Sequence, residues 1–208
     1  MTARIIILTK EPLPGRVKTR LAPGLRPGGP ERIHQALVDE TLSRALATGL
    51  PVDVCLAGDP HGPFAARLRS AGAAVLPQAC GDLGARLTAA LAGPGRRLVL
   101  GTDCPLLEPA WLLAAVDDPA PVVLGPSDDG GYWMLTIDAP CPGLFRDIPW
   151  STAAVAATTM NRARELGLHV SLAPTCYDID EPADLQRLLA DPRCSIALRD
   201  TALPLLRR

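Results

Sequence analysis

Short apolar runs alternate with segments of helical periodicity along most of the 208-residue chain, and this alternation constrains the fold more than any other feature. Apolar runs suited to buried parallel strands occur at residues 4–9, 52–57, 74–77, 97–101, 122–125, 132–137 and 169–173. Helical patterns lie between most of them, at residues 31–48, 64–71, 83–91, 110–116, 153–166 and 182–190. The alternation predicts a single-domain, three-layer α/β/α sandwich around a mostly parallel central sheet.

The end of the chain lacks this regular pattern. No long linker or internal repeat interrupts residues 1–190, which we expect to form one domain. Residues 191–208 carry apolar side chains without a clear period. We expect this extension to be a closing strand, a segment packed on the domain, or a contact between copies in a homo-oligomer.

Charge and hydropathy exclude several classes of partner. A net charge of −1 and an isoelectric point near 6.3 give no general attraction to nucleic acid or to an anionic membrane. No apolar run approaches the ~20 residues that cross a bilayer, and the first residues lack a signal-peptide pattern. We therefore expect a cytoplasmic protein that acts on small molecules.

Three cations follow the first expected strand, at Arg16, Lys18 and Arg20. Ligands of open α/β sheets bind at the carboxyl ends of the strands, and clustered cations there favour phosphate. An extended backbone would point all three side chains the same way. The segment is not a P-loop, because Val17 stands where glycine must precede the lysine. The alternative is a solvated surface cluster.

Aspartates follow two other expected elements. Asp103 comes directly after the strand at 97–101, where a carboxylate can hold a divalent cation or cap the next helix. Asp178 and Asp180 share one side of an extended segment, although one of them could also cap the helix that Pro182 opens. A metal site needs a second carboxylate opposite Asp103, and Asp180 is our candidate.

A further acidic segment reads Asp128-Asp129-Gly130-Gly131. Asp-Gly is a strong hairpin signal, so an ordinary turn is one interpretation. Glycines also let the backbone approach a ligand closely while a carboxylate faces it. Considered beside the other polar loops of the chain, this segment is better interpreted as part of a ligand-binding site.

Six motifs, taken in order, resemble a known family. They are PLPGRVKTRL at 12–21, GDLGAR at 81–86, GTDCP at 101–105, DDGGY at 128–132, LFRDIPWST at 144–152 and DID at 178–180. The set resembles the bacterial GT-A-like transferases associated with radical-SAM genes, some of which are called arsenosugar-biosynthesis glycosyltransferases. Two departures are Met134-Leu135-Thr136, where an apolar-Gly-apolar segment is expected, and Glu181, where threonine is common.

The resemblance implies a nucleotide-diphospho-sugar transferase fold and a set of binding roles. Nucleotide phosphates would lie near Lys18 and Arg20, with Arg16 close by. Asp103 and Asp180, together with Asp178, would hold Mg²⁺ or Mn²⁺. The loop beneath the nucleotide would be ordered by Asp82 and Arg86, for which a structural ion pair is the alternative.

The resemblance also implies an acceptor side. Asp129 and Asp128 would face the sugar or acceptor, with Asp129 as the candidate general base. The substrate pocket would include Gly130 and Gly131, and Trp150 and Ser151 would close one of its walls.

Three functions are consistent with these residues. The first is glycosyl transfer from a nucleotide-diphospho-sugar to a small-molecule acceptor. The second is nucleotidyl transfer from a nucleoside triphosphate to a phosphorylated small molecule, as in guanylyltransferases. The third is a noncatalytic nucleotide-sugar-binding protein, against which the carboxylates in three separate motifs argue.

Overall fold

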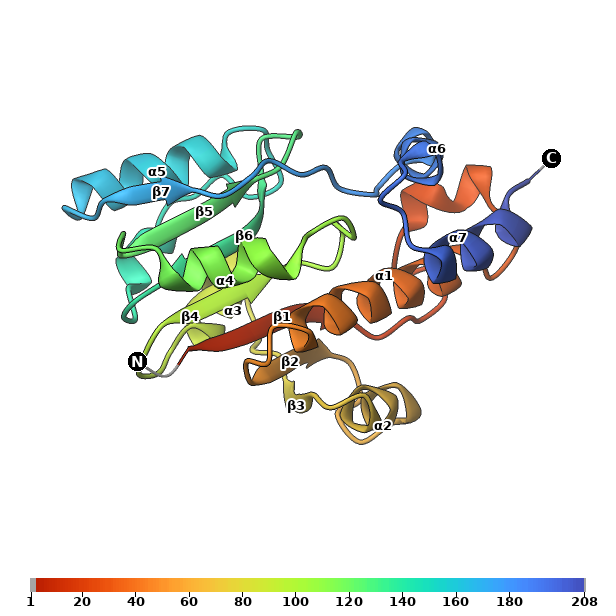
Figure 1. Ribbon diagram of the computed structural model, residues 1–208, viewed down its shortest axis with the longest axis horizontal. Coiled ribbons are helices and arrows are strands. Elements are labelled where there is room, and N and C mark those ends of the chain that lie inside the picture. Colours follow the sequence, from red (N-terminus) through yellow and green to blue (C-terminus); the bar gives the residue numbers. More distant parts are fainter. Residues whose placement is uncertain (1–2, 208) are drawn as a thin grey trace.

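A seven-stranded sheet forms the centre of the computed structural model, which describes residues 3–207 (Figure 1). The strands are β1 (Arg4–Lys10), β2 (Val52–Ala57), β3 (Ala74–Pro77), β4 (Arg97–Leu100), β5 (Val122–Pro126), β6 (Tyr132–Ile137) and β7 (Val170–Leu172). Their order across the sheet is β3-β2-β1-β4-β6-β5-β7. The pairs that exclude β6 are all parallel, whereas β6 runs antiparallel to β4 and β5. The mostly parallel sheet expected from the sequence is confirmed.

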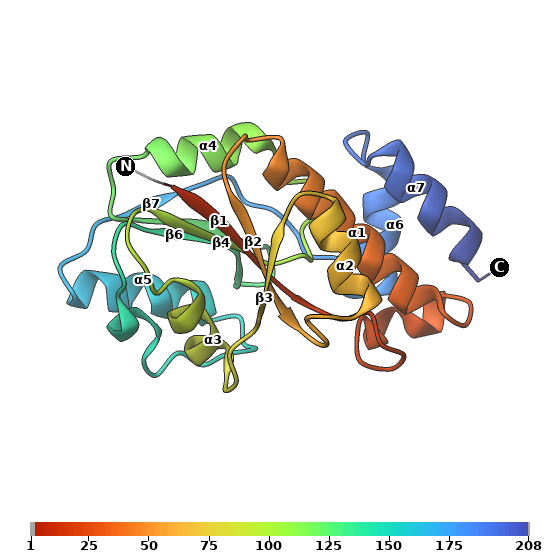
Figure 2. The same cartoon turned by 90° about the horizontal axis from the view of Figure 1, so that it is seen from below.

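Helices cover both faces of the sheet (Figure 2). The α-helices are α1 (Gly29–Leu46), α2 (Pro63–Ser70), α3 (Leu83–Ala90), α4 (Pro109–Asp117), α5 (Val155–Glu165), α6 (Pro182–Ala190) and α7 (Ile196–Ala202). Short 3-10 helices are η1 (Thr19–Gly24), η2 (Pro142–Phe145) and η3 (Leu203–Leu205). One face carries α1, α2 and α4, and the other carries α3 and α5, so the α/β/α sandwich is confirmed.

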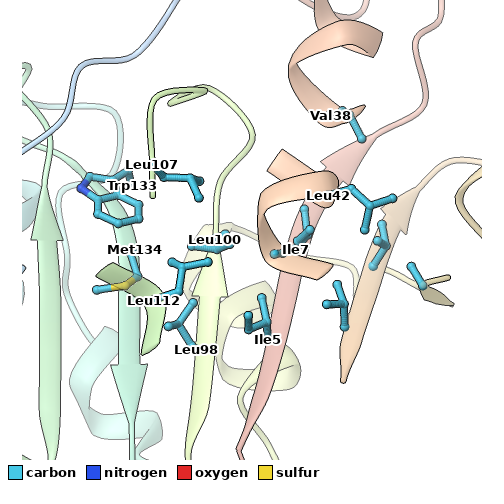
Figure 3. Close-up of a cluster of buried hydrophobic side chains, with 14 of the residues drawn as sticks. Ile5, Ile7, Val38, Leu42, Leu98, Leu100, Leu107, Leu112, Trp133 and Met134 are labelled. Carbon is cyan, nitrogen blue, oxygen red and sulfur yellow. The ribbon is translucent and has the colours of Figure 1, made fainter. Parts of the chain in front are cut away.

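Alternate residues of the strands supply the two apolar layers, as the twofold period of a strand requires. Ile5 and Ile7 of β1 pack with Val38 and Leu42 of α1, whereas Ile6 packs toward the other face (Figure 3). Strands buried on both faces have little room for polar side chains, which therefore concentrate at the strand ends. This packing leaves the carboxyl edge of the sheet as the place for a polar site.

The last part of the described chain packs beside α1, away from the sheet (Figure 1). α6, α7 and η1 share a third apolar cluster with α1, which includes Ile33, Leu37, Leu185 and Leu198. The sequence showed no clear helical period in α7, because a helix this short offers few repeats of its apolar face. The expected domain (residues 1–190) and the expected extension (residues 191–208) include residues 1, 2 and 208, which lie outside the described residues.

A helix that crosses a bilayer must be both long and apolar. Within residues 3–207, none of the helices meets both conditions.

Candidate active site

A cleft of about 660 Å³ opens at the carboxyl edge of the sheet, across the ends of β1 and β4. This volume lies within the range of small-ligand sites. Of the expected site residues, the cleft is lined by Arg16, Lys18, Arg20, Arg86, Asp103, Ser151 and Asp180. Segments far apart in the sequence therefore meet at one edge, as the parallel topology predicts.

The loop after β1 is folded rather than extended. Gly15 (φ +70°) and Lys18 (φ +46°) both adopt the left-handed conformation, and η1 begins at Thr19. The expectation that an extended backbone points three cations the same way is therefore wrong. Lys18 is instead buried, with 5% of its side chain exposed, while the Arg20 side chain is 63% exposed.

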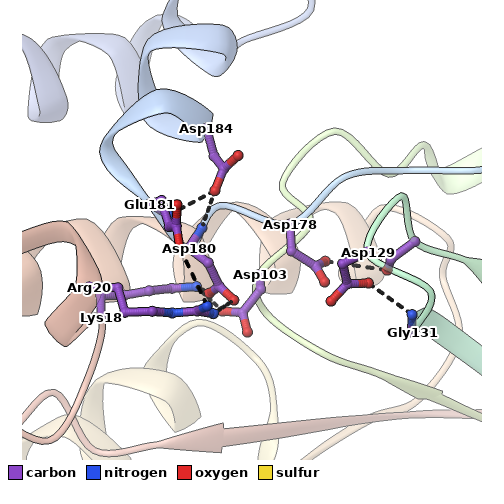
Figure 4. A network of polar contacts seen from close by, with 10 residues as sticks. Lys18, Arg20, Asp103, Asp129, Gly131, Asp178, Asp180, Glu181 and Asp184 are labelled. Carbon is purple, nitrogen blue, oxygen red and sulfur yellow. Dashed lines mark hydrogen bonds and ion pairs between the residues drawn. The ribbon is translucent and has the colours of Figure 1, made fainter. Parts of the chain in front are cut away.

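Lys18 lies between two carboxylates from different segments (Figure 4). Its Nζ is 2.5 Å from Asp103 Oδ1 and 3.0 Å from Asp180 Oδ1. Arg20 forms a second ion pair with Asp180. The backbone holds the two acidic segments together, since Ile179 N donates to the Asp103 carbonyl at 2.9 Å. The structure thus brings together the two aspartates that the sequence suggested as partners.

Electrostatics around Lys18 keep it charged. Burial alone lowers the pKa of the ammonium group, but the nearby Asp103 and Asp180 carboxylates outweigh burial and raise it above its usual value. Lys18 is therefore a permanent cation at neutral pH.

Asp178 lies next to this pair and carries a perturbed carboxyl group. Burial, together with the negative charges of Asp103, Asp129 and Asp180, raises the pKa of Asp178 to about 7. Four aspartates thus share one region with a single buried lysine. Such a surplus of hard oxygen donors fits a divalent cation chemically. Among residues 3–207, however, no three potential ligands are arranged so that they could already hold a metal ion.

The raised pKa of Asp178 predicts an effect on stability. Between pH 4 and 7 the folded protein holds a proton on Asp178 that the unfolded chain releases, so stability falls as pH rises through this range. Asp178→Asn is expected to stabilise the metal-free protein by about 2 kcal/mol at pH 8 and much less at pH 5. Urea unfolding in the presence of chelator measures this difference. An equal effect at both pH values would show that the charge of Asp178 is not responsible.

The Asp128–Gly131 segment is the hairpin that joins β5 to β6, as the turn interpretation proposed. Asp129 Oδ1 accepts a hydrogen bond from Gly131 N at 2.9 Å within the turn, which directs the Asp129 carboxyl group toward Asp178 (Figure 4). Asp128 points elsewhere and pairs with Arg187 of α6 at 2.9 Å. The turn and the site are therefore compatible at Asp129, whereas Asp128 connects the hairpin to α6.

Several expected site residues lie behind the cleft rather than on its surface. Gly130 packs against Ala153, and Trp150 packs against Gly84 of α3. Neither residue lines the cleft, and neither does Gly131. Ser151 follows Trp150 with φ +63° and does line the cleft. Trp150 therefore supports the cleft wall by packing, while Ser151 belongs to its surface.

Asp82 and Arg86 act separately. Asp82 caps α3, because its Oδ1 accepts a hydrogen bond from Ala85 N at 2.8 Å. Arg86 lines the cleft and donates through Nε to the Gly81 carbonyl at 2.9 Å. The two residues form no ion pair with each other in the described chain. The structure thus orders this loop by a helix cap.

The N-terminus of α6 is capped by Asp184, and not by Asp178 or Asp180. Asp184 Oδ2 accepts hydrogen bonds from the backbone N–H groups of Asp180 and Glu181, at 3.1 and 2.7 Å. The side chains of Asp178 and Asp180 are therefore not used as helix caps, and Asp180 lines the cleft and pairs with Lys18 and Arg20 (Figure 4).

Sequence reasoning missed His34, which lines the cleft from α1. Its Nε2 donates to the Lys10 carbonyl at 2.9 Å, and burial lowers the pKa of the imidazole. From the sequence, His34 was interpreted as a surface or packing residue of the first helix, and nothing in the pattern indicated that it reaches the cleft. Gln78 also lines the cleft and had no sequence signal, whereas the lining residues Thr102 and Tyr132 belong to the GTDCP and DDGGY motifs.

Comparison with known proteins places the chain in a family. Residues 41–152, more than half of the chain, match the family described as "Uncharacterized protein conserved in bacteria (DUF2064)". The chain belongs to the DUF2064 family. The search of curated proteins gave no match for this DUF2064 protein.

Solved structures agree on the fold of this DUF2064 member. A protein from Desulfovibrio desulfuricans G20, provisionally assigned as a nucleotide-diphospho-sugar transferase, is 26% identical, with a TM-score of 0.86 over 97% of this chain and 92% of that one. The inositol-1-phosphate CTP transferase from T. maritima is 13% identical, with a TM-score of 0.61 and 98% of both chains covered. Rv0371c from Mycobacterium tuberculosis H37Rv, solved in complex with manganese, is 18% identical, with a TM-score of 0.51 and 90% and 97% covered. The fold is that of the nucleotide-diphospho-sugar transferases, and the first two of these neighbours are described as transferases.

Proposed function

We propose that this DUF2064 protein is a divalent-metal-dependent glycosyltransferase that moves a sugar from a nucleotide-diphospho-sugar to a small-molecule acceptor. The observation that carries this proposal is the buried Lys18 between the carboxylates of Asp103 and Asp180, at a cleft in the carboxyl edge of the sheet. The similarity to the D. desulfuricans protein over nearly the full chain supports it.

Each part of the cleft has a proposed task. Lys18, Arg20, Arg16 and Arg86 would bind the diphosphate through charge-assisted hydrogen bonds. Asp103 and Asp180, with Asp178 behind them, would hold Mg²⁺ or Mn²⁺. The manganese complex of the more distant Rv0371c supports this choice of ion. When bound, the ion would neutralise the charge that develops on the leaving diphosphate.

Asp129 is the proposed general base. It would take the proton of the acceptor hydroxyl as that oxygen bonds to the sugar carbon, while the bond from the same carbon to the diphosphate breaks. One of its carboxylate oxygens is fixed by Gly131 N, so the carboxyl group is oriented before substrate binds. Asp128, held by Arg187, would keep the hairpin in place.

A second candidate is nucleotidyl transfer from a triphosphate to a phosphorylated acceptor. The lysines and arginines that line the cleft would suit a triphosphate as well as a diphosphate, and one fold neighbour is named as a CTP transferase. If the chain shares the role of the arsenosugar-biosynthesis glycosyltransferases associated with radical-SAM genes, its function would be a special case of the first candidate, glycosyl transfer.

Thermal unfolding tests the proposal across nucleosides, nucleoside diphosphates, nucleotide sugars and triphosphates, each with Mn²⁺ and with chelator. A ligand at about 100 times its dissociation constant stabilises by ~2.7 kcal/mol, or roughly 5 to 10 °C here. We expect uridine, guanosine or thymidine nucleotide sugars to give this shift only with metal, followed by slow release of free sugar. A triphosphate preference with pyrophosphate release would favour nucleotidyl transfer. Binding without turnover over a broad acceptor panel would favour a binding protein, and no shift would contradict all three.

A further inference from the structure

In the free protein Lys18 fills the position that the proposed function assigns to a metal ion. Its ammonium group is within 3.0 Å of a carboxylate oxygen of Asp103 and one of Asp180. Only 5% of the Lys18 side chain is exposed, so little solvent reaches its ammonium group, whereas the Asp103 carboxylate stays open to solvent on its other side. The same lysine is the most enclosed of the cations that a phosphate would meet in the cleft.

The backbone of Lys18 is suited to a change of position. Its φ of +46° is left-handed, which is unfavourable for a residue with a Cβ and persists only where other contacts hold it. The two ion pairs hold it here, together with the hydrogen bond that Leu21 N donates to the Lys18 carbonyl at 3.0 Å. Lys18 also lies in the connection between β1 and η1, outside the strands and α-helices.

We propose that Lys18 is an internal substitute for the metal ion, and that it exchanges Asp103 and Asp180 for the phosphates of the incoming nucleotide. This inference rests on the proposed nucleotide site and adds a rule for how that site is loaded. While Lys18 neutralises the two carboxylates, a divalent cation must displace it. A phosphate group, in turn, must draw Lys18 away from them.

The exchange couples the two ligands. A metal alone would leave the displaced ammonium without a partner, and a phosphate alone would leave the two carboxylates uncompensated. Bound together, the ligands give every charge a partner of opposite sign. By linkage, each ligand raises the affinity of the site for the other by the same factor. Coupling of this kind is typically about 5-fold to 150-fold.

Lys18→Met tests the exchange, because methionine keeps much of the side-chain length without the charge. We expect the variant to bind Mn²⁺ in the absence of nucleotide at least fivefold more tightly than the wild type, by calorimetry. Its affinity for a nucleoside diphosphate should fall. Arg146→Met is the control, because Arg146 is exposed, does not line the cleft and forms no ion pair within residues 3–207. This control should leave Mn²⁺ affinity within about twofold.

A second measurement uses the wild-type protein and does not depend on the folding of a variant. Lys10 and Lys18 are the only lysines in the sequence, so mass spectrometry after brief acetylation reports each one separately. Lys10 is exposed and lines the same cleft, so its acetylation shows whether the metal affects the cleft in general or Lys18 alone. We expect Lys18 to be protected in metal-free protein, to become reactive as Mg²⁺ is added, and to be protected again when a nucleoside diphosphate joins the metal.

Two results would overturn the inference. One is an unchanged or weaker Mn²⁺ affinity in a folded Lys18→Met protein, which would make Lys18 a fixed structural counter-ion. The other is Lys18 acetylation that stays flat across a Mg²⁺ titration to tens of millimolar. Metal-dependent nucleotide binding by the wild type would survive either result, so the proposed function and this loading rule can fail separately.

Discussion

Asp103→Asn is expected to remove metal-dependent binding of a nucleoside diphosphate while the protein stays folded. The substitution replaces a carboxylate, the proposed metal ligand, with an amide of nearly the same shape. The backbone contact of this segment survives, because Ile179 N donates to the carbonyl of residue 103 and not to its side chain. Since 46% of the Asp103 side chain is exposed, its removal leaves no buried cavity.

The expected loss is tenfold or more, because charge-assisted contacts contribute ~1.5 to 3 kcal/mol each. Calorimetry with Mn²⁺ and a nucleoside diphosphate measures it, and Asp180→Asn should give a loss of the same order. Asp200→Asn, an exposed change on α7, is the control. Wild-type affinity in both cleft variants would remove these aspartates from the site.

Gly130→Ala is expected to destabilise the protein by about 3 kcal/mol or more. Gly130 has φ +86°, and an added Cβ would lie 2.1 Å from the Ala153 carbonyl oxygen. That neighbour is backbone just before α5, and α5 is itself held to the hairpin, because Ala156 N donates to the Gly130 carbonyl at 2.9 Å. The clash therefore cannot be relieved by rotating a side chain.

Gly131→Ala is the matched control in the same hairpin. The nearest atom to a Cβ at Gly131 is a side-chain oxygen of Asp129 at 3.1 Å, which can move. Urea unfolding should therefore show a much smaller loss for Gly131→Ala than for Gly130→Ala. Equal losses would mean that contact with α5 is not the reason for glycine at position 130.

The fold was predictable because its strands are buried on both faces and therefore appear as apolar runs such as residues 4–8 and 97–100. The antiparallel direction of β6 was harder to predict from the sequence. Its apolar run resembles that of a parallel strand, and only the Asp-Gly turn before it indicated a hairpin. Strand order depends on long-range pairing, which a local pattern does not report.

The candidate site could be predicted in part for a related reason. Asp103 comes directly after β4 and must therefore lie at the carboxyl edge of the sheet. Asp180 lies just before α6, and its approach to Asp103 was predicted because a metal site needs a second carboxylate. The position of Lys18 between them was not predicted. It depends on two left-handed residues in the preceding loop, and only one of these, Gly15, is a glycine that signals such a conformation.

Anomalous diffraction at the manganese edge tests the central claim most directly, using crystals grown with Mn²⁺ and a nucleoside diphosphate. The account predicts one strong peak within ~2.2 Å of carboxylate oxygens of Asp103 and Asp180, with the phosphates against Lys18. Lys18 would then no longer contact both carboxylates. A nucleotide bound outside the cleft, or manganese elsewhere while Lys18 still bridges Asp103 and Asp180, would contradict it.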